Sequence, residues 1–185
     1  MTDGTAEFLI RPARDGDLDV IAGFEIDIAR ASFGDEAIED AALHRKRVAA
    51  ALGKPGEVTL VAVAVKGESE ERMGRRAGGG GEGAPVGWAW LSGRTNSLTG
   101  ARYGNFRSLA TADVADRGIV AELLMAAVVQ AAAQAGYTHL TGKTHARNLG
   151  MRALYRKFGF EATHLTMEWR PGATAAGEPG GEAGR

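Results

Sequence analysis

The sequence predicts a single α/β domain. The main observation is that the second half of the chain alternates strand-like and helix-like segments in the order β-α-β-α-β. Both helical segments of that half are followed by a glycine, Gly136 and Gly159, which is a common signal for the end of a helix. The length of 185 residues and the hydrophobic fraction of 44% suit one domain with a proper core and are short for two domains.

The first half of the chain supplies strands and two helices. Residues 15–32 carry apolar residues at helical spacing, and residues 58–65 form a β-branched run that is typical of a buried strand. A second helix is predicted at residues 36–52, because a glycine and then a proline follow it. Two further strands are predicted at residues 8–13 and 86–91.

The second half contains two predicted helices between three strands. The first helix, at residues 119–135, has one apolar stripe, and the second begins at Asn148, a favourable residue for an N-cap. The stripe of the first helix comprises Val120, Leu123, Leu124, Ala127, Val128 and Ala131. The stripe of the second comprises Met151, Leu154, Tyr155 and Phe158. The strands are predicted at residues 102–111, 137–144 and 161–169.

Two segments have compositions that do not build a core. Residues 66–85 are rich in glycine and mixed charge, which predicts a flexible surface loop within a domain that spans residues 8–170. Glycines in this loop satisfy the spacing G-x-G-x-x-G, but no helix opens after them, so they do not predict a dinucleotide site. Residues 171–185 lack large apolar side chains and are predicted to be a disordered tail.

Composition excludes several classes of function. A formal net charge of −1 gives no indication of a nucleic-acid partner. The chain has no cysteine, and its four histidines are not paired at metal-ligand spacing, so no metal site is expected. The apolar runs are too short to span a bilayer, and a signal peptide's apolar centre is missing, so we expect a cytoplasmic protein without a membrane partner. A homodimer remains open.

Two glycine-containing turns could bind phosphate. The sequence Gly142-Lys143-Thr144 resembles the end of a P-loop, but the first glycine of that motif is out of register and the segment lies late in a strand. Residues 115–124 form a turn that leads directly into a helix, and Gly118 would let a ligand approach the backbone closely. Free N–H groups at such a helix start suit a pyrophosphate, although any strand-to-helix turn can carry a glycine.

The segment from Asn148 to Phe160 has the pattern N-x-x-M-x-x-L-Y-x-K-x-G-F. Together with the preceding strand, glycine turn and helix, it resembles the GNAT superfamily of acetyl-CoA-dependent N-acetyltransferases, over roughly residues 8–170. The resemblance implies a GNAT fold: a mixed, twisted sheet of about six strands with helices on both faces.

The resemblance also implies where acetyl-CoA binds as co-substrate. In the family the turn follows the pattern Q/R-x-x-G-x-G/A, whereas this chain has Ala115 and Val120 at the outer positions and keeps Gly118, with Arg117 as an alternative cation. The residues expected to contact the cofactor are Leu109, Thr111, Arg117, Gly118, Ile119, Val120, Ala121 and Asn148. Backbone N–H groups near Leu109 and Thr111 are expected to stabilise the oxyanion.

Tyr155 is the catalytic residue that the resemblance implies, as the acid that protonates the leaving thiolate. Its position on an apolar helix stripe is also consistent with ordinary core packing. The general base is left open among Glu25, Asp27, Glu36 and His145, each of which also suits a solvated charge or a helix cap. Trp88 and Trp90 share one face of a strand, which favours packing over a role as a platform for the acceptor.

The function expected from the resemblance is transfer of an acetyl group from acetyl-CoA to a primary amine of a small molecule or peptide. A non-catalytic acyl-CoA-binding module is the alternative, because of Ala115 and Val120 in the turn. An enzyme that uses a longer acyl-CoA is a third option. The identity of the amine acceptor does not follow from these residues.

Overall fold

The computed structural model describes residues 7–65 and 83–164. The loop predicted at residues 66–85 therefore lies mostly outside the described residues, and its last residue, Pro85, is the first of a strand. The tail predicted at residues 171–185 lies outside them altogether.

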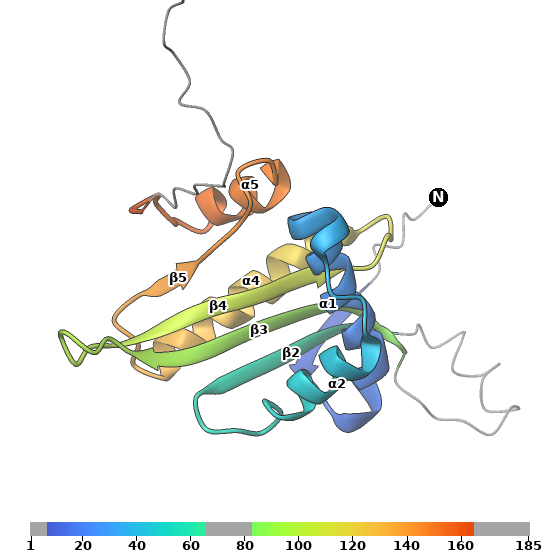
Figure 1. The fold of residues 1–185 in the computed structure, drawn as a ribbon, viewed down its shortest axis with the longest axis horizontal. Coiled ribbons are helices and arrows are strands. Elements are labelled where there is room, and N and C mark those ends of the chain that lie inside the picture. Colours follow the sequence, from blue (N-terminus) through green and yellow to red (C-terminus); the bar gives the residue numbers. More distant parts are fainter. Residues whose placement is uncertain (1–6, 66–82, 165–185) are drawn as a thin grey trace, which may run out of the picture.

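The centre of the fold is a mixed, five-stranded sheet with the order β1-β2-β3-β4-β5 (Figure 1). The strands are β1 (Phe8–Pro12), β2 (Glu57–Ala64), β3 (Pro85–Thr95), β4 (Arg102–Thr111) and β5 (Leu140–Gly142). The first four pair antiparallel, and β5 pairs parallel to β4. A mixed sheet is therefore confirmed, with five strands among the described residues rather than about six.

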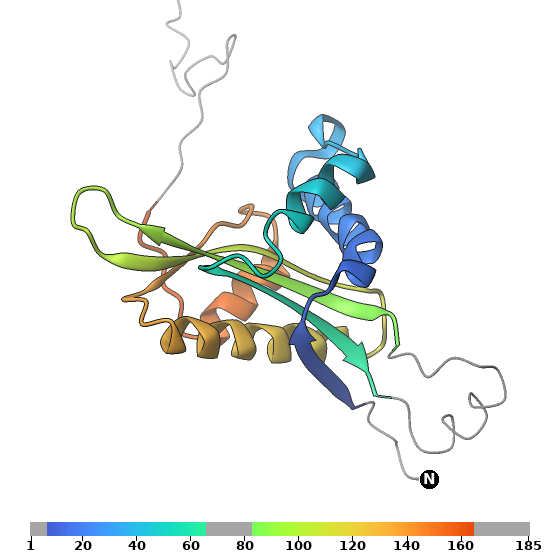
Figure 2. The ribbon, with the colours of Figure 1, turned by 90° about the horizontal axis from the view of Figure 1, so that it is seen from below.

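Helices cover both faces of the sheet, as expected (Figure 2). The helices α1 (Leu18–Phe33) and α2 (Ala41–Ala49) lie on one face, while α4 (Arg117–Gln134) and α5 (Leu149–Lys157) lie on the other. Short 3-10 turns, Asp15–Asp17 and Gly34–Glu36, flank α1.

The alternation of side chains along β3 divides the core into two clusters. Trp88 and Trp90 point toward α1 and α2 and pack with residues such as Ile21, Phe24 and Val48. Ala89 and Leu91, on the opposite face, pack with Phe106 and with buried residues of α4 and α5. The prediction that both tryptophans pack in the core is confirmed, since each is at most 3% exposed.

The apolar stripe of α4 is rotated from the one predicted. Val120, Leu124 and Val128 are buried as expected, but Met125 is buried as well and Leu123 is 38% exposed. Apolar residues surround most of this helix, so the sequence contains little information on which side faces the sheet. By length and composition alone, this helix could also cross a membrane. A helix that packs against a sheet passes the same test, so the finding is weak evidence.

Three predicted elements are shorter by several residues or are not formed as expected. The second helix begins only at Ala41, because the Asp40 carboxylate accepts hydrogen bonds from the N–H groups of Ala42 and Leu43 and caps it there. The strand predicted at residues 137–144 is limited to β5. The strand predicted at residues 161–169 is wrong for 161–164, which have no regular structure, and its remainder lies outside the described residues.

The ring of Tyr155 on α5 rests directly on the backbone of Gly142 in β5. A Cβ atom at Gly142 would overlap both the hydroxyl and the ring of Tyr155. Packing between β5 and α5 therefore requires a residue without a side chain at this position.

We expect Gly142→Ala to lower the free energy of unfolding by about 1–3 kcal/mol, the usual cost of overpacking a core. Chemical denaturation of the purified protein measures this change. Gly150→Ala is the matched control, because the nearest atom to its added Cβ would be 3.9 Å away, and we expect it to be neutral or slightly stabilising. Equal stabilities of the two variants would contradict the contact between Tyr155 and Gly142.

Candidate functional site

A cavity lies where β5 separates from β4. β5 pairs only with Gly104, Asn105 and Phe106 of β4, although β4 continues to Thr111 (Figure 1). Beyond Phe106, one edge of β4 therefore has no partner strand among the described residues.

A β-bulge at Arg107 lies where the two strands part. Trp90 of β3 is opposite Ser108, and the next residue, Leu91, is opposite Phe106, so Arg107 is the extra residue in β4. Such an insertion reverses the side-chain and backbone alternation that follows it. Phe106 accordingly packs on the face of α4 and α5, whereas Ser108 is paired with Trp90, whose side chain faces α1 and α2.

The alternation of N–H groups along β4 can be traced on either side of this bulge. The N–H of Gly104 donates to the His139 carbonyl at 3.0 Å, on the side of β5. After the bulge, the N–H of Ala112 donates to the Val86 carbonyl at 2.8 Å, on the side of β3. Since N–H groups alternate along a strand, those of Leu109 and Thr111 point away from β3 and into the gap.

The cavity at this gap has a volume of about 250 Å³. It is lined by residues of α1 (Asp27, Ile28, Ala31, Ser32), of β4 (106–111) and of the segment after β5 together with α5 (Lys143, Thr144, Asn148, Met151, Tyr155). Because α1 and α5 lie on opposite faces of the sheet, a cavity lined by both passes through the sheet edge. Its lining therefore comes from both faces of the sheet.

Tyr155 lines this cavity and also belongs to the hydrophobic core. It is 9% exposed, and its ring contacts the rings of Phe106 and Phe160, with centroids 6.1 and 4.8 Å away. Burial raises the pKa of Tyr155 to about 12, because the phenolate is poorly solvated there. The phenol is therefore protonated at neutral pH, and its hydroxyl makes no hydrogen bond within residues 7–65 and 83–164.

Asn148 caps α5 and also lines the cavity. Its side-chain oxygen accepts a hydrogen bond from the N–H of Met151 at 2.9 Å, which confirms the predicted cap. The amide group of its side chain is left for another contact.

The predicted cofactor turn lies at the start of α4, outside the cavity wall. Arg117, Gly118 and Ile119 are exposed, and the N–H groups of Gly118 and Ile119 have no acceptor within the described part of the chain. No atom lies within 4 Å of the position that a Cβ of Gly118 would take, so the surface there is open. Such a helix start favours a bound anion.

Two of the residues predicted to bind the cofactor at this turn expose little surface to a ligand. Val120 is fully buried under Gly87, and its N–H donates to the Asp116 carbonyl, so the structure places it in the core. Ala121 is half-buried. Arg117 makes an exposed ion pair with Asp113 at 3.2 Å, which leaves its guanidinium partly engaged.

Of the residues considered as a general base, Asp27 alone lines the cavity. Its side chain is 70% exposed and lies 3.8 Å from Arg30. Glu36 is exposed, and the ring of His145 accepts a hydrogen bond from the N–H of Arg147. Neither belongs to the cavity wall.

Glu25 differs from the solvated charge that the sequence suggested. It is 3% exposed, accepts a hydrogen bond from the Trp88 indole at 2.8 Å and pairs with Arg47 of α2. Its role in the described structure is to join α1 to the sheet and to α2.

Sequence reasoning missed three residues of the site. Gly142 and Lys143 were noticed only as an imperfect phosphate motif, and nothing in the sequence linked Gly142 to Tyr155. Arg107 was not singled out. The residues on both sides of it favour a strand, so a single sequence gives no clear sign of the bulge. No group of three His, Asp or Glu side chains that could hold a metal occurs within residues 7–65 and 83–164.

Comparisons with solved structures show the fold. This chain is similar to aminoglycoside N-acetyltransferase AAC(6')-Iy in complex with CoA, with a TM-score of 0.64 and 18% identity over 94% of this chain and 100% of that one. Aminoglycoside 6'-N-acetyltransferase AAC(6')-Ih from Acinetobacter baumannii has a TM-score of 0.60 and 13% identity over 91% and 100%. A transcriptional regulator from Bacillus halodurans C-125 has a TM-score of 0.66 and 16% identity over 89% and 99%. At such identities the likeness concerns the fold alone.

The sequence comparison identifies the family. A comparison with curated proteins finds no significant match. The Acetyltransferase (GNAT) family, in contrast, matches residues 37–160, which is more than half of the chain. The chain therefore belongs to the GNAT family of acetyltransferases.

Proposed function

We propose that this protein transfers an acetyl group from acetyl-CoA to a primary amine. The observation that carries the proposal is the cavity between β4 and β5, which is lined by α1 on one face of the sheet and by Tyr155 on the other. Two inward-facing N–H groups, of Leu109 and Thr111, are available along the same gap. The arrangement suits a reaction between two substrates that enter from opposite faces.

The residues around the gap fit acetyl-CoA, which supplies the acetyl group as a thioester. The free N–H groups of Gly118 and Ile119 suit its pyrophosphate, and the open surface at Gly118 permits close approach. One of the N–H groups of Leu109 and Thr111, together with the Asn148 amide, would hold the pantetheine arm along the edge of β4, and the other would remain for the thioester carbonyl.

Three groups of this chain would act on the reacting atoms. The nitrogen of a neutral amine forms a bond to the carbonyl carbon, the carbon–sulfur bond breaks, and the amine gives up one proton. Asp27, which lines the cavity, would accept that proton, directly or through water. A backbone N–H of Leu109 or Thr111 stabilises the negative charge on the carbonyl oxygen, and the Tyr155 hydroxyl donates to the departing sulfur.

The acidity of Tyr155 limits how much it contributes. A thiol has a pKa of about 8.5, so a phenol whose pKa is raised to about 12 holds its proton more tightly than the thiol would. Full proton transfer to the thiolate is therefore uphill, and Tyr155 acts mainly by donating a hydrogen bond as the sulfur departs.

Tyr155→Phe keeps the ring and removes the oxygen. We expect kcat to fall by about 10²-fold, the lower end of a general acid's contribution, with little change in acetyl-CoA affinity. The release of free CoA thiol, measured across a panel of amines, tests the activity. Tyr103→Phe is the matched control, since Tyr103 stacks on His139 outside the cavity, and it should leave turnover unchanged. If Tyr155→Phe turns over like the wild type, Tyr155 has only a packing role. If the wild type itself acetylates no amine, the alternative of a non-catalytic acyl-CoA-binding module is favoured.

The raised pKa of Tyr155 predicts a late alkaline titration. The unfolded phenol loses its proton near pH 10 and the folded one near pH 12, so stability falls as pH rises through this window. The tyrosinate absorbance of the wild type minus that of Tyr155→Phe should therefore show a transition near pH 12. A difference transition near pH 10 would show that Tyr155 is solvated.

Gly118→Ala separates cofactor binding from folding. No atom of the protein lies near the added methyl group, and alanine favours a helix start more than glycine does, so stability should be unchanged or rise by up to about 1 kcal/mol. The methyl group would instead hinder a pyrophosphate at these N–H groups, and the Kd for acetyl-CoA, measured by calorimetry, should rise about tenfold or more. Unchanged affinity would place the pyrophosphate elsewhere.

A further inference from the structure

Positive side chains outnumber negative ones in the cavity wall. Arg107 and Lys143 are cationic, and Asp27 is the one carboxylate. Asp27 already has Arg30 as a neighbour at 3.8 Å. Within residues 7–65 and 83–164, neither Arg107 nor Lys143 makes an ion pair or a hydrogen bond to the protein. Among the described residues, the cavity therefore offers two cations that no protein carboxylate pairs with.

Arg107 is held on a rigid surface. Its guanidinium carbon lies 4.4 Å from the centroid of the Trp90 ring, a cation–π contact. Trp90 is itself fixed, because it is 3% exposed and its indole N–H donates to the Glu57 carboxylate at 2.7 Å. Glu57 accepts from Trp90 and Ser92, and Glu25 accepts from Trp88 and pairs with Arg47; within residues 7–65 and 83–164 neither carboxylate pairs with Arg107.

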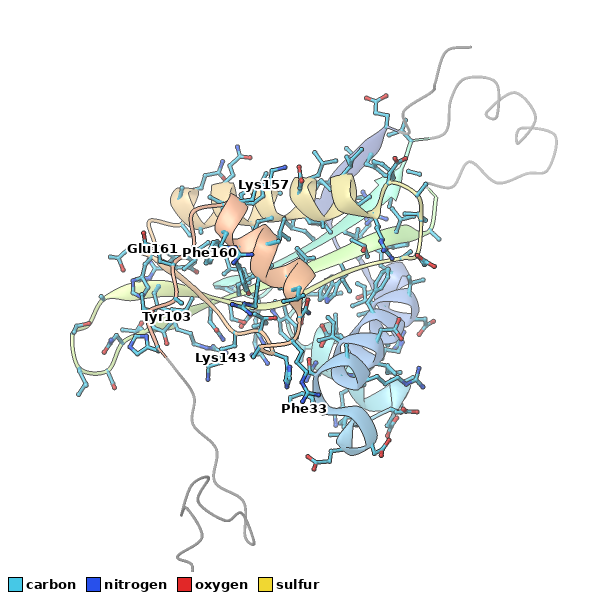
Figure 3. All side chains as sticks on the ribbon, turned by 90° about the horizontal axis from the view of Figure 1, so that it is seen from above. Phe33, Tyr103, Lys143, Lys157, Phe160 and Glu161 are labelled. Atoms are coloured by element: carbon cyan, nitrogen blue, oxygen red, sulfur yellow. The ribbon has the colours of Figure 1, made fainter. Side chains whose placement is uncertain are left out.

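Both cations lie on the side of the sheet that carries α1. Arg107 lies over Trp90, whose ring packs with α1 and α2. A Cβ at Gly142, the last residue of β5, would point toward Tyr155 and α5, and Lys143 is the first residue after that strand. Figure 3 shows Lys143 on the side of α1, whereas Lys157 lies with α4 on the other side, where it pairs with Glu122.

We propose that the amine acceptor carries a carboxylate, which Arg107 and Lys143 bind while the amine lies toward Asp27. This proposal rests on the proposed acetyl transfer and names the class of acceptor for the same cavity. The planar guanidinium of Arg107 can donate two parallel hydrogen bonds to a carboxylate, and Lys143 adds a second positive charge.

The same charges disfavour a polycationic acceptor. Two unpaired cations repel an ammonium-rich molecule such as an aminoglycoside, so the class of acceptor differs from the one named for the two N-acetyltransferases of similar fold. They also disfavour the protonated form of a nearby amine, and acyl transfer requires the neutral form. An acceptor that is an amine at one end and a carboxylate at the other satisfies both conditions.

Matched amines test the proposal. Each amine is offered with a carboxylate or with a carboxamide, as in 5-aminopentanoate and 5-aminopentanamide, where the amine lies several bonds from the group that differs. Turnover is followed by release of CoA thiol, and binding is measured separately by calorimetry in the presence of CoA. We expect the carboxylate to be preferred about tenfold or more in both measurements, and kanamycin to be the poorer substrate. Equal use of carboxylate and carboxamide would overturn the proposal.

Arg107→Gln should abolish this preference. We expect a loss of about 10- to 100-fold in kcat/KM and in affinity for the carboxylate, the worth of a hydrogen bond between charged groups, with the carboxamide unaffected. Arg107→Lys should lie between the two, because it keeps the charge and loses the paired hydrogen bonds. Arg94→Gln is the matched control, an exposed arginine of β3 outside the cavity.

Two results separate this proposal from neighbouring ones. If Arg107→Gln weakens acetyl-CoA binding instead, the cation serves the phosphates of the cofactor and the acceptor assignment is overturned. If no amine is acetylated but the carboxylate still binds selectively and depends on Arg107, the proposed acetyl transfer fails while the carboxylate site stands. A preference that persists in Arg107→Gln contradicts the site itself.

Discussion

The single extra residue in β4, Arg107, is the feature on which the site depends. Without this bulge, the alternation before it would continue, and the N–H groups of Leu109 and Thr111 would point toward β3 rather than into the gap. The same insertion lays the Arg107 side chain over Trp90, beside the cavity. A local irregularity of one residue thus decides which N–H groups face the free edge, those of Leu109 and Thr111 in place of those of Ser108 and Ala110, and it places a cation next to them.

The position of α1 against this edge is set by a buried charge rather than by apolar packing alone. Glu25 accepts from the indole of Trp88 and pairs with Arg47, so one carboxylate joins α1 to β3 and to α2. Removing either partner would leave a buried charge incompletely paired, which is costly. Two residues further along the same helix, Asp27 lines the cavity, and its distance from β4 therefore depends on the contacts of Glu25 as well as on the apolar packing of α1.

Much of the fold followed from the sequence, but much of the site's geometry did not. The alternation of β and α segments, Asn148 as a cap and the core position of Trp88 depend on local periodicity and capping, which a single sequence records. The prediction of the buried face of α4 was partly wrong, because apolar residues lie on nearly all sides of this helix and the sequence does not distinguish a buried side from an exposed one. The contact of Gly142 with Tyr155 and the partners of Glu25 arise only when distant segments meet, and no spacing along the chain contains them.

Tyr155 illustrates why packing and chemistry need not be alternatives. Its ring closes the core between α5 and β5, and this burial is what raises the pKa of its hydroxyl to about 12. A tyrosine placed for tight packing is thus a weaker acid than a solvated one, but its hydroxyl is held at one point of the cavity wall by the backbone of Gly142. A fixed hydrogen-bond donor needs no reorganisation when charge develops beside it, and this compensates for part of the lost acidity. The packing that makes the hydroxyl a poor proton source is therefore the packing that makes it a well-positioned donor.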